Sequence, residues 1–214
     1  MSCQPARLPS ALITQAVIWG PRSVIRSVPR ITVTPTALAL YRARQQGRLG
    51  RETESLKQLL DAQPKQTAVR AVYAEALRTA GNHKDAMFEL ERVTTEAPSD
   101  PVAWNNLAWL YLESGDRRGL VAARRAHELA PQSVQIADTY GWALLQTGNH
   151  QAALEVLKLA AANARNQPQI AYHYAVALAK TGATVQARAL LTEIVRGKVP
   201  FSEREAATKL LSEL

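Results

Sequence analysis

Cysteine is almost absent from this sequence: Cys3 is the single one among 214 residues. One cysteine cannot form an internal disulfide, and it cannot supply the thiolates of a cysteine-based zinc cluster. The redox compartment is left open. The fold has to be held by an apolar core, and this length suffices because such a chain buries roughly 70% of its unfolded surface.

Catalytic signatures are also missing from the sequence. It contains no G-x-S-x-G, H-E-x-x-H, phosphate-binding-loop or dinucleotide glycine pattern. Two histidines, His83 and His150, follow a turn glycine by two residues, where a structural role is expected. His127 is expected to face outward from a helix, and His173 has no second histidine or cysteine in register. We therefore expect no enzyme activity, no cofactor and no metal.

No apolar run is long enough to cross a bilayer. The best candidate, residues 11–20, is interrupted by Gln15. It is far shorter than the roughly 20 residues that a transmembrane helix requires. A direct membrane span is therefore not expected.

Acidic side chains are lacking in residues 1–51, which carry eight arginines. The remaining residues carry 18 basic and all 18 acidic side chains, so the net charge of +8 belongs to the N-terminal part. A neutral body does not supply the counterion release that drives nucleic-acid binding, and no nucleic-acid partner is expected. Residues 1–32 form a basic leader. It is interpreted as a targeting-like segment, a disordered tail or the product of a misassigned start.

What the sequence does contain is a repeat. Glycines recur every 33 or 34 residues, at Gly47, Gly81, Gly115, Gly148 and Gly182. Prolines recur at the same spacing, at Pro64, Pro98 and Pro131. Two amphipathic stretches lie between these marks, with the three-and-four spacing of apolar residues that is typical of helices. Each unit is therefore predicted to be a helical hairpin, and the units span 33–66, 67–100, 101–133, 134–167 and 168–200.

Each hairpin has a large residue followed by a small one at its seventh and eighth positions. The pairs are Tyr73–Ala74, Leu107–Ala108, Tyr140–Gly141 and Tyr174–Ala175 in the last four units. The second helices carry a matching small residue at Ala86, Gly119, Ala153 and Ala187. Small residues let two helices approach closely beside a bulky side chain, so these positions predict the hairpin contact.

The period, the hairpins and the proline that ends each unit resemble the tetratricopeptide repeat, a 34-residue helix-turn-helix with a W-x2-L-G-x2-Y pattern. Trp104, Leu107, Ala108 and Tyr111 match that pattern, with alanine in place of glycine. The resemblance covers about residues 33–214 and is weaker for 33–66. It implies an all-α, right-handed superhelical solenoid of about five hairpins.

A capping helix is expected at residues 201–214, because a stack of hairpins has to cover its last apolar face. Ser202 and Glu205 have the spacing of a capping box. Ala206 and the leucines Leu210, Leu211 and Leu214 are expected to lie on the last repeat.

The resemblance to tetratricopeptide repeats also indicates a binding face. In proteins of this type, positions five, six and nine of the first helix line a concave groove. In three successive units these positions are Asn105, Asn106 and Trp109; Asp138, Thr139 and Trp142; and Tyr172 and His173. The two tryptophans are interpreted as an apolar anchor with the polar residues as its rim. The alternative is that the indoles pack against each other or against the leader and close the groove.

Other positions carry less specific signals. Trp104, at position four, is expected to serve the core. The cluster Arg117, Arg118, Arg124 and Arg125 is interpreted as a solvated outer face, with a docking patch as the alternative. A clamp for a C-terminal carboxylate is not expected, because Gln135 and Thr139 stand where such a clamp has lysine and arginine.

Several stretches, among them NNLAWLYLESGD and VPFSEREAATKLLSEL, are similar to the C-terminal repeats of bacterial repeat lipoproteins associated with PEP-CTERM sorting and exopolysaccharide systems. This similarity implies a cell-envelope or periplasmic location, whereas the chain by itself would be assigned to the cytoplasm. We expect a non-enzymatic scaffold that binds a peptide or helix of a protein partner in an export or exopolysaccharide assembly. The alternatives are a chaperone-like module for unfolded clients or a fragment of a longer repeat protein, and the oligomeric state is open.

Overall fold

The computed structural model describes residues 53–164 and 166–214, which contain ten α-helices and no strand. The helices are α2 (Thr53–Ala62), α3 (Thr67–Thr79), α4 (His83–Glu96), α5 (Pro101–Glu113), α6 (Arg118–Leu129), α7 (Val134–Gln146), α8 (His150–Asn163), α9 (Pro168–Lys180), α10 (Thr184–Arg196) and α11 (Arg204–Glu213). The predicted all-α class is confirmed. The leader at 1–32 and the first helix of the 33–66 unit lie outside the described residues.

Consecutive helices pair into hairpins, α3 with α4, α5 with α6, α7 with α8 and α9 with α10, and α2 packs on α3. A glycine ends the first helix of each pair with φ between +71° and +86°. This left-handed backbone is unfavourable for other residues, which explains the regular recurrence of Gly81, Gly115, Gly148 and Gly182. The second helix follows within a few residues.

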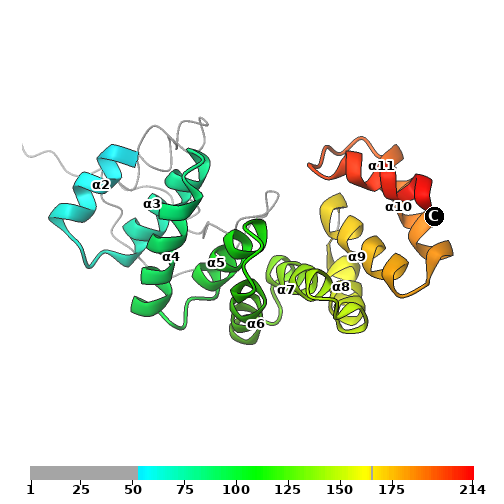
Figure 1. Cartoon of the computed structure of the whole chain (residues 1–214), viewed down its shortest axis with the longest axis horizontal. Coiled ribbons are helices and arrows are strands. Elements are labelled where there is room, and N and C mark those ends of the chain that lie inside the picture. The colour runs from blue at the N-terminus through cyan, green and yellow to red at the C-terminus, as the bar shows by residue number, and fades with distance from the viewer. Residues whose placement is uncertain (1–52, 165) are drawn as a thin grey trace, which may run out of the picture.

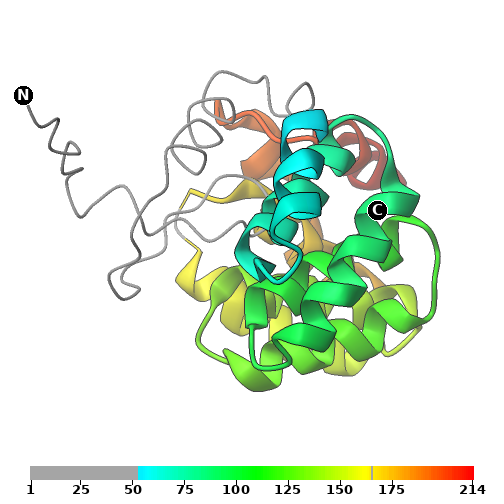
Figure 2. The ribbon, with the colours of Figure 1, turned by 90° about the vertical axis from the view of Figure 1, so that its left-hand side faces the viewer.

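The hairpins follow one another along an arc, from α2 at one end to α10 and α11 at the other (Figure 1). Seen from the α2 end, the later hairpins lie behind the earlier ones (Figure 2). Helix α5 also contacts α7, and α7 contacts α9. The first helices of successive units therefore line the inner side of the arc.

Small residues hold the two helices of each hairpin close together. Six of the predicted small positions are fully buried: Ala74, Ala86, Ala108, Ala153, Ala175 and Ala187. The tightest approach is at Gly141 of α7, where an added Cβ would lie 2.4 Å from Cγ of Leu157 in α8. A glycine is therefore required there by contact with the neighbouring helix and not by its backbone angles.

Position four of each unit lies on the first helix, beside the loop that leads in from the preceding hairpin. In the second unit it is Arg70, which is 2% exposed and bonds Glu89 at 2.6 Å, lies 3.6 Å from Glu96 and donates to the carbonyl of Pro64. Burial of a charged group requires such partners. The network thus fastens α3 to α4 and to the loop before it.

The third unit fills the same position differently. Its Trp104 packs against the core cluster that includes Leu107 and Ala122, and its indole nitrogen donates to the Pro98 carbonyl at 3.0 Å. Arg70 and Trp104 thus both reach the carbonyl of the proline that ends the preceding unit. The expected core role of Trp104 agrees with this packing.

Helix α11 covers the end of the stack. Ala207 is fully buried, and Phe201, Leu210, Leu211 and Leu214 pack with it against the cluster that contains Leu191 and Ile194. The alanine on the last repeat is therefore Ala207, and the prediction of Ala206 was wrong. Helix α11 begins at Arg204, one residue after the start that a cap at Ser202 would give.

The predicted capping box is also wrong. Helix α11 begins at Arg204 without a side-chain cap, and the Ser202 hydroxyl donates to the carboxylate of Glu203. The connection is held by Arg204, whose guanidinium donates to the carbonyl of Val195 in the last turn of α10 and to those of Gly197 and Val199 in the loop that follows. The arginine thus satisfies carbonyls at the end of α10, where a helix leaves its last carbonyls without helical partners.

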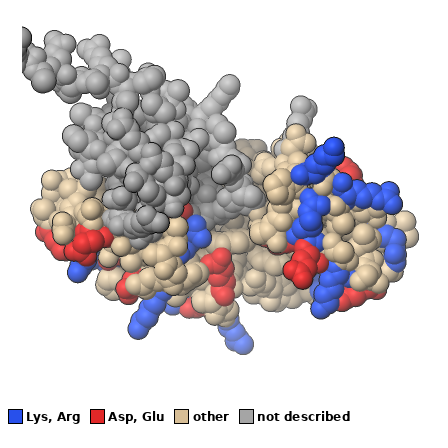
Figure 3. All heavy atoms as spheres, turned by 90° about the horizontal axis from the view of Figure 1, so that it is seen from above, with Lys and Arg blue, Asp and Glu red and all other residues tan. Residues whose placement is uncertain are grey.

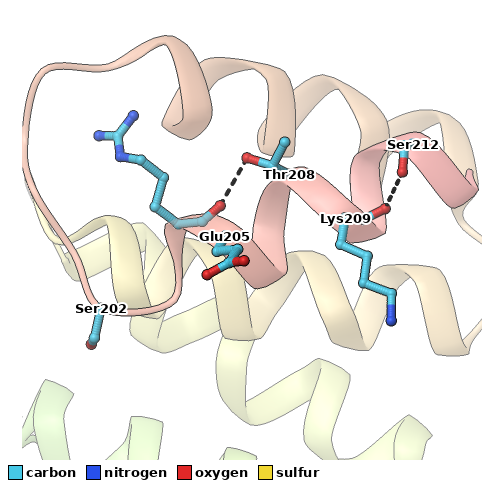
Figure 4. Close-up of a pocket in the computed structure, with 6 residues that line it drawn as sticks. Ser202, Glu205, Thr208, Lys209 and Ser212 are labelled. Carbon is cyan, nitrogen blue, oxygen red and sulfur yellow. Dashed lines mark hydrogen bonds between the residues drawn. The ribbon is translucent and has the colours of Figure 1, made fainter.

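The outer face of α11 is polar. A shallow depression there is lined by Ser202, Arg204, Glu205, Thr208, Lys209 and Ser212 (Figure 4). The Thr208 hydroxyl donates to the Arg204 carbonyl at 2.9 Å and that of Ser212 to the Lys209 carbonyl at 2.6 Å. These bonds stay within the helix, so this face is a solvated cap.

The close approach at Gly141 gives a test of the hairpin contact. We expect Gly141→Val to lower the free energy of unfolding by about 2 kcal/mol or more, because Leu157 has to move out of its packed position. Urea unfolding followed by circular dichroism measures this. The control is Ala152→Val at an exposed site of α8, which should change stability by only about 0.5 kcal/mol. Equal effects of the two substitutions would contradict the contact.

Candidate functional site

The predicted binding residues lie on three helices that touch in succession. Asn105, Asn106 and Trp109 belong to α5, Asp138, Thr139 and Trp142 to α7, and Tyr172 and His173 to α9. Trp109 and Trp142 both pack against the same core cluster. The topology therefore brings the two indoles to one side of the stack, and each keeps part of its surface exposed.

The polar residues of this face are buried. Their exposed fractions are 0% for Asn105, 2% for Asn106, 6% for Asp138, 3% for Thr139, 8% for Tyr172 and 1% for His173. The polar residues that were interpreted as the rim therefore lie largely below the surface. A period of 33 or 34 residues predicts which helix face a side chain takes, but the depth of burial depends on how strongly successive hairpins curve toward each other.

The Trp142 ring packs on a buried histidine that contacts an aspartate of the preceding repeat. Nδ1 of His173 lies 2.7 Å from Oδ1 of Asp138, which joins α9 to α7. The indole of Trp142 stacks on the His173 ring at 4.2 Å and 23°, and Tyr172 stands at 6.3 Å from it. Trp142 thus packs within the protein, on partners that the sequence interpretation had not named for it.

Trp109 has a different environment. Its indole nitrogen donates to Oε1 of Glu113 at 2.9 Å, one turn further along α5. The other carboxylate oxygen of Glu113 lies 3.6 Å from Nδ1 of His83, at the start of α4. Both groups of this second contact are exposed, so the tether is weak. Glu113 was missed by the sequence interpretation, although its i,i+4 spacing from Trp109 is a usable signal.

Asn105 is the unusual residue of this face. Its side chain is fully buried, and neither its amide nitrogen nor its amide oxygen has a hydrogen-bond partner. Leaving a buried polar group unpaired costs about 1–3 kcal/mol. Residues four apart lie on the same face of a helix, so Trp109 is one turn away from Asn105 on α5. The inner face of α5 thus has a weakly tethered indole one turn from an unsatisfied, buried amide.

Two ionisable residues of the outer helix α6, His127 and Arg118, make contacts within the protein. His127 was expected to face outward, but its ring stacks on Tyr140 of α7 at 5.2 Å and 23°, and burial lowers its pKa. Arg118 is engaged rather than free: it pairs with Asp116 at 2.7 Å and Glu91 at 2.8 Å and lies 4.3 Å from the ring centre of Tyr111. Burial and the hydrogen bond to Glu91 raise the pKa of Tyr111.

The described part of the chain offers no group of three or more histidine, cysteine, aspartate or glutamate side chains that could hold a metal ion. None of its helices is both long and apolar enough to cross a bilayer. On the face seen from above, basic and acidic side chains are interleaved over the C-terminal helices (Figure 3).

A stack of helical hairpins whose first helices line one inner face is the architecture of helical-repeat proteins. A tetratricopeptide repeat model matches residues 33–196, and the chain belongs to this family. A search of the curated proteins found no matching sequence.

Solved structures share the fold at low sequence identity. PilF of Pseudomonas aeruginosa is 20% identical, with a TM-score of 0.67 over 82% of this chain and 81% of that one. MamA from Desulfovibrio magneticus RS-1 is 14% identical, with a TM-score of 0.65 over 73% and 89%. YrrB, described as a TPR protein with an unusual peptide-binding site, is 12% identical, with a TM-score of 0.60 over 75% and 84%. These likenesses establish the solenoid architecture.

The buried pair between α7 and α9 gives a second test. We expect His173→Ala to lower the free energy of unfolding by about 3 kcal/mol or more, because it leaves the Asp138 carboxylate buried without its partner. Urea unfolding of His173→Ala, Asp138→Ala and the double variant measures the coupling. The exposed contact of His83 serves as the control, and His83→Ala should cost at most about 0.5 kcal/mol. Strictly additive effects at 138 and 173 would show that the two groups do not stabilise each other.

Proposed function

We propose that this protein is a non-catalytic scaffold that binds an extended segment of a protein partner along the inner face of α5 and α7, with Trp109 as the apolar anchor. The observation that carries the proposal is the fully buried and unpaired amide of Asn105, one helical turn from the partly exposed indole of Trp109. Proteins of the tetratricopeptide repeat family bind protein or peptide partners, and this face has the features that such binding requires.

The proposed contact has two steps. In the first, the Trp109 indole leaves its position on the face of α5 one turn from Asn105, which breaks one hydrogen bond to the exposed Glu113. A peptide backbone then takes its place, because an amide side chain has both a donor and an acceptor to match a peptide group. The displaced indole covers apolar side chains of the partner, and each 100 Å² so buried contributes about 2.5 kcal/mol.

Trp142 has a supporting role in this proposal. Because it is stacked on His173, it is held in one orientation and forms a fixed wall on α7, the first helix of the following unit. Asp138, Thr139, Tyr172 and His173 shape the face from below, and Asn106 already has an interaction in the structure. The binding residues are thus divided between one movable anchor and a rigid surround.

We place this scaffold in a bacterial envelope export or exopolysaccharide assembly. The support is the similarity of several stretches, such as AYHYAVALAKTG, to the repeats of PEP-CTERM-associated lipoproteins. In such an assembly a repeat protein joins components without acting on them, which agrees with a face built for contact.

Asn105 allows a sharp test of the proposal. We expect Asn105→Leu to raise the free energy of unfolding by about 1 kcal/mol or more, because an unpaired buried amide is replaced by an apolar group of similar shape. The same variant should weaken peptide binding. The control is Thr139→Val, since the Thr139 hydroxyl is already bonded to the Gln135 carbonyl at 3.1 Å, and it should not be stabilised. A variant at 105 that is destabilised, or that binds as before, contradicts the proposal.

The anchor is tested with peptides from a displayed random library that are selected for binding to the full chain. Trp109→Ala should weaken the selected peptide by about tenfold or more, which corresponds to about 1.4 kcal/mol. Phe88→Ala removes a more exposed aromatic from the outer helix α4, where the residue is 56% exposed, and should leave affinity unchanged. Denatured unrelated proteins should not compete; equal competition would indicate the chaperone-like alternative and contradict the scaffold.

A further inference from the structure

The residue at position four fills a space between hairpins in two of the units. Arg70 occupies it in the second unit and reaches Glu89, Glu96 and the Pro64 carbonyl. Trp104 occupies it in the third unit and reaches the Pro98 carbonyl. The second helix of the unit and the proline of the preceding loop thus bound one space that recurs from unit to unit. In these two units a large side chain of the protein itself fills it.

Alanine stands at position four of the next two units, as Ala137 and Ala171. At each alanine the structure has a pocket. The first, between α6, α7 and α8, has a volume of about 360 Å³ and is lined by Ala137, Val156, Asn163 and Pro131 among others. The second, one unit later, has a volume of about 600 Å³ and includes Ala171 in its wall.

The walls of the first pocket correspond to the partners of Arg70 and Trp104. Val156 and Asn163 of α8 stand where α4 has Glu89 and Glu96, and Pro131 stands where the earlier units have Pro64 and Pro98. The pocket is therefore the space that Trp104 fills one unit earlier, left open because alanine is too small.

Two features make this pocket suited to a ligand. Nδ1 of His127, in its wall, is buried and has no hydrogen-bond partner. Leu159 stands at the same pocket with 68% of its surface exposed, so an apolar side chain at the mouth is available to cover a ligand. An occupant with an apolar ring and one N–H group would cover the leucine and satisfy a buried acceptor.

We propose that the pocket at Ala137 is a socket for a tryptophan side chain supplied by a partner protein. Trp104 is the internal template: the same kind of cavity, one unit away, accepts an indole and bonds its nitrogen. The socket lies between α6, α7 and α8 and the loop that joins α6 to α7. None of the residues that line it belongs to the set proposed for peptide binding on the inner face. The scaffold would thus have a second, independent contact for a bulky aromatic residue.

The experiment uses the full chain and N-acetyl-tryptophanamide as the probe. Methyl resonances of Val134, Val156 and Leu159 and the ring signals of His127 should shift saturably on titration. Ala137→Trp fills the socket from within and should weaken the probe by about tenfold or more. Ala171→Trp fills the neighbouring pocket and is the matched control, in which the shifts near His127 persist.

A variant at the pocket mouth keeps the proposal testable if Ala137→Trp disturbs folding. Leu159 is exposed, so Leu159→Ser should leave the thermal unfolding temperature unchanged while weakening the probe several-fold. Asn105→Leu should leave probe binding unchanged, which separates failure of the socket from failure of the inner-face proposal.

Three results would overturn the socket. Absence of saturable shifts at Val156 and His127 excludes a ring-binding site. Binding of free indole without binding of N-acetyl-tryptophanamide indicates a small-molecule site and not a side-chain socket. If Trp19→Ala, a change in the leader, is needed before the probe binds, the socket is filled by this chain itself and not by a partner.

Discussion

The close approach of the two helices within each hairpin is the constraint on which the rest of the structure depends. Alanine or glycine stands at the meeting point in every described hairpin, and at Gly141 even one added carbon would collide with Leu157. Because the contact recurs at the same place in each unit, the hairpins have one shape and stack in phase. Phase is what carries positions five, six and nine onto a common face.

That common face is not uniform. Toward the C-terminal end, Asp138, His173 and Trp142 satisfy one another, so the surface there is rigid and internally complete. Toward α5, Trp109 is tied by one exposed hydrogen bond and lies one turn from a buried amide that has no partner. An unsatisfied buried group is costly for stability, and natural proteins retain such costs at sites of function. We therefore propose the α5 side as the place of binding.

The repeat period, the turn glycines and the small contact residues could be predicted from the sequence because each is a local requirement. A left-handed turn needs glycine, and a close helix contact needs alanine or glycine, wherever the rest of the chain lies. The start of α11 could not be predicted, since the connection is held by Arg204 through bonds to the carbonyls of Val195, Gly197 and Val199 and not by the expected capping box. The burial of His173 and Asn105 was missed for a similar reason: it depends on curvature summed over several units. The pocket at Ala137 leaves a readable trace, a small residue at a position that is large in the two preceding units, but its meaning is visible only beside Trp104.

The most direct measurement of the central claim is the side-chain amide signal of Asn105 in ¹⁵N-resolved NMR spectra of the full chain, with and without a bound peptide. Capture of the peptide backbone by this amide predicts a large shift of both amide protons and slowed exchange with solvent in the complex. A peptide that binds while the Asn105 amide signal stays where it was would contradict the account, because the Asn105 amide would then have no role in recognition.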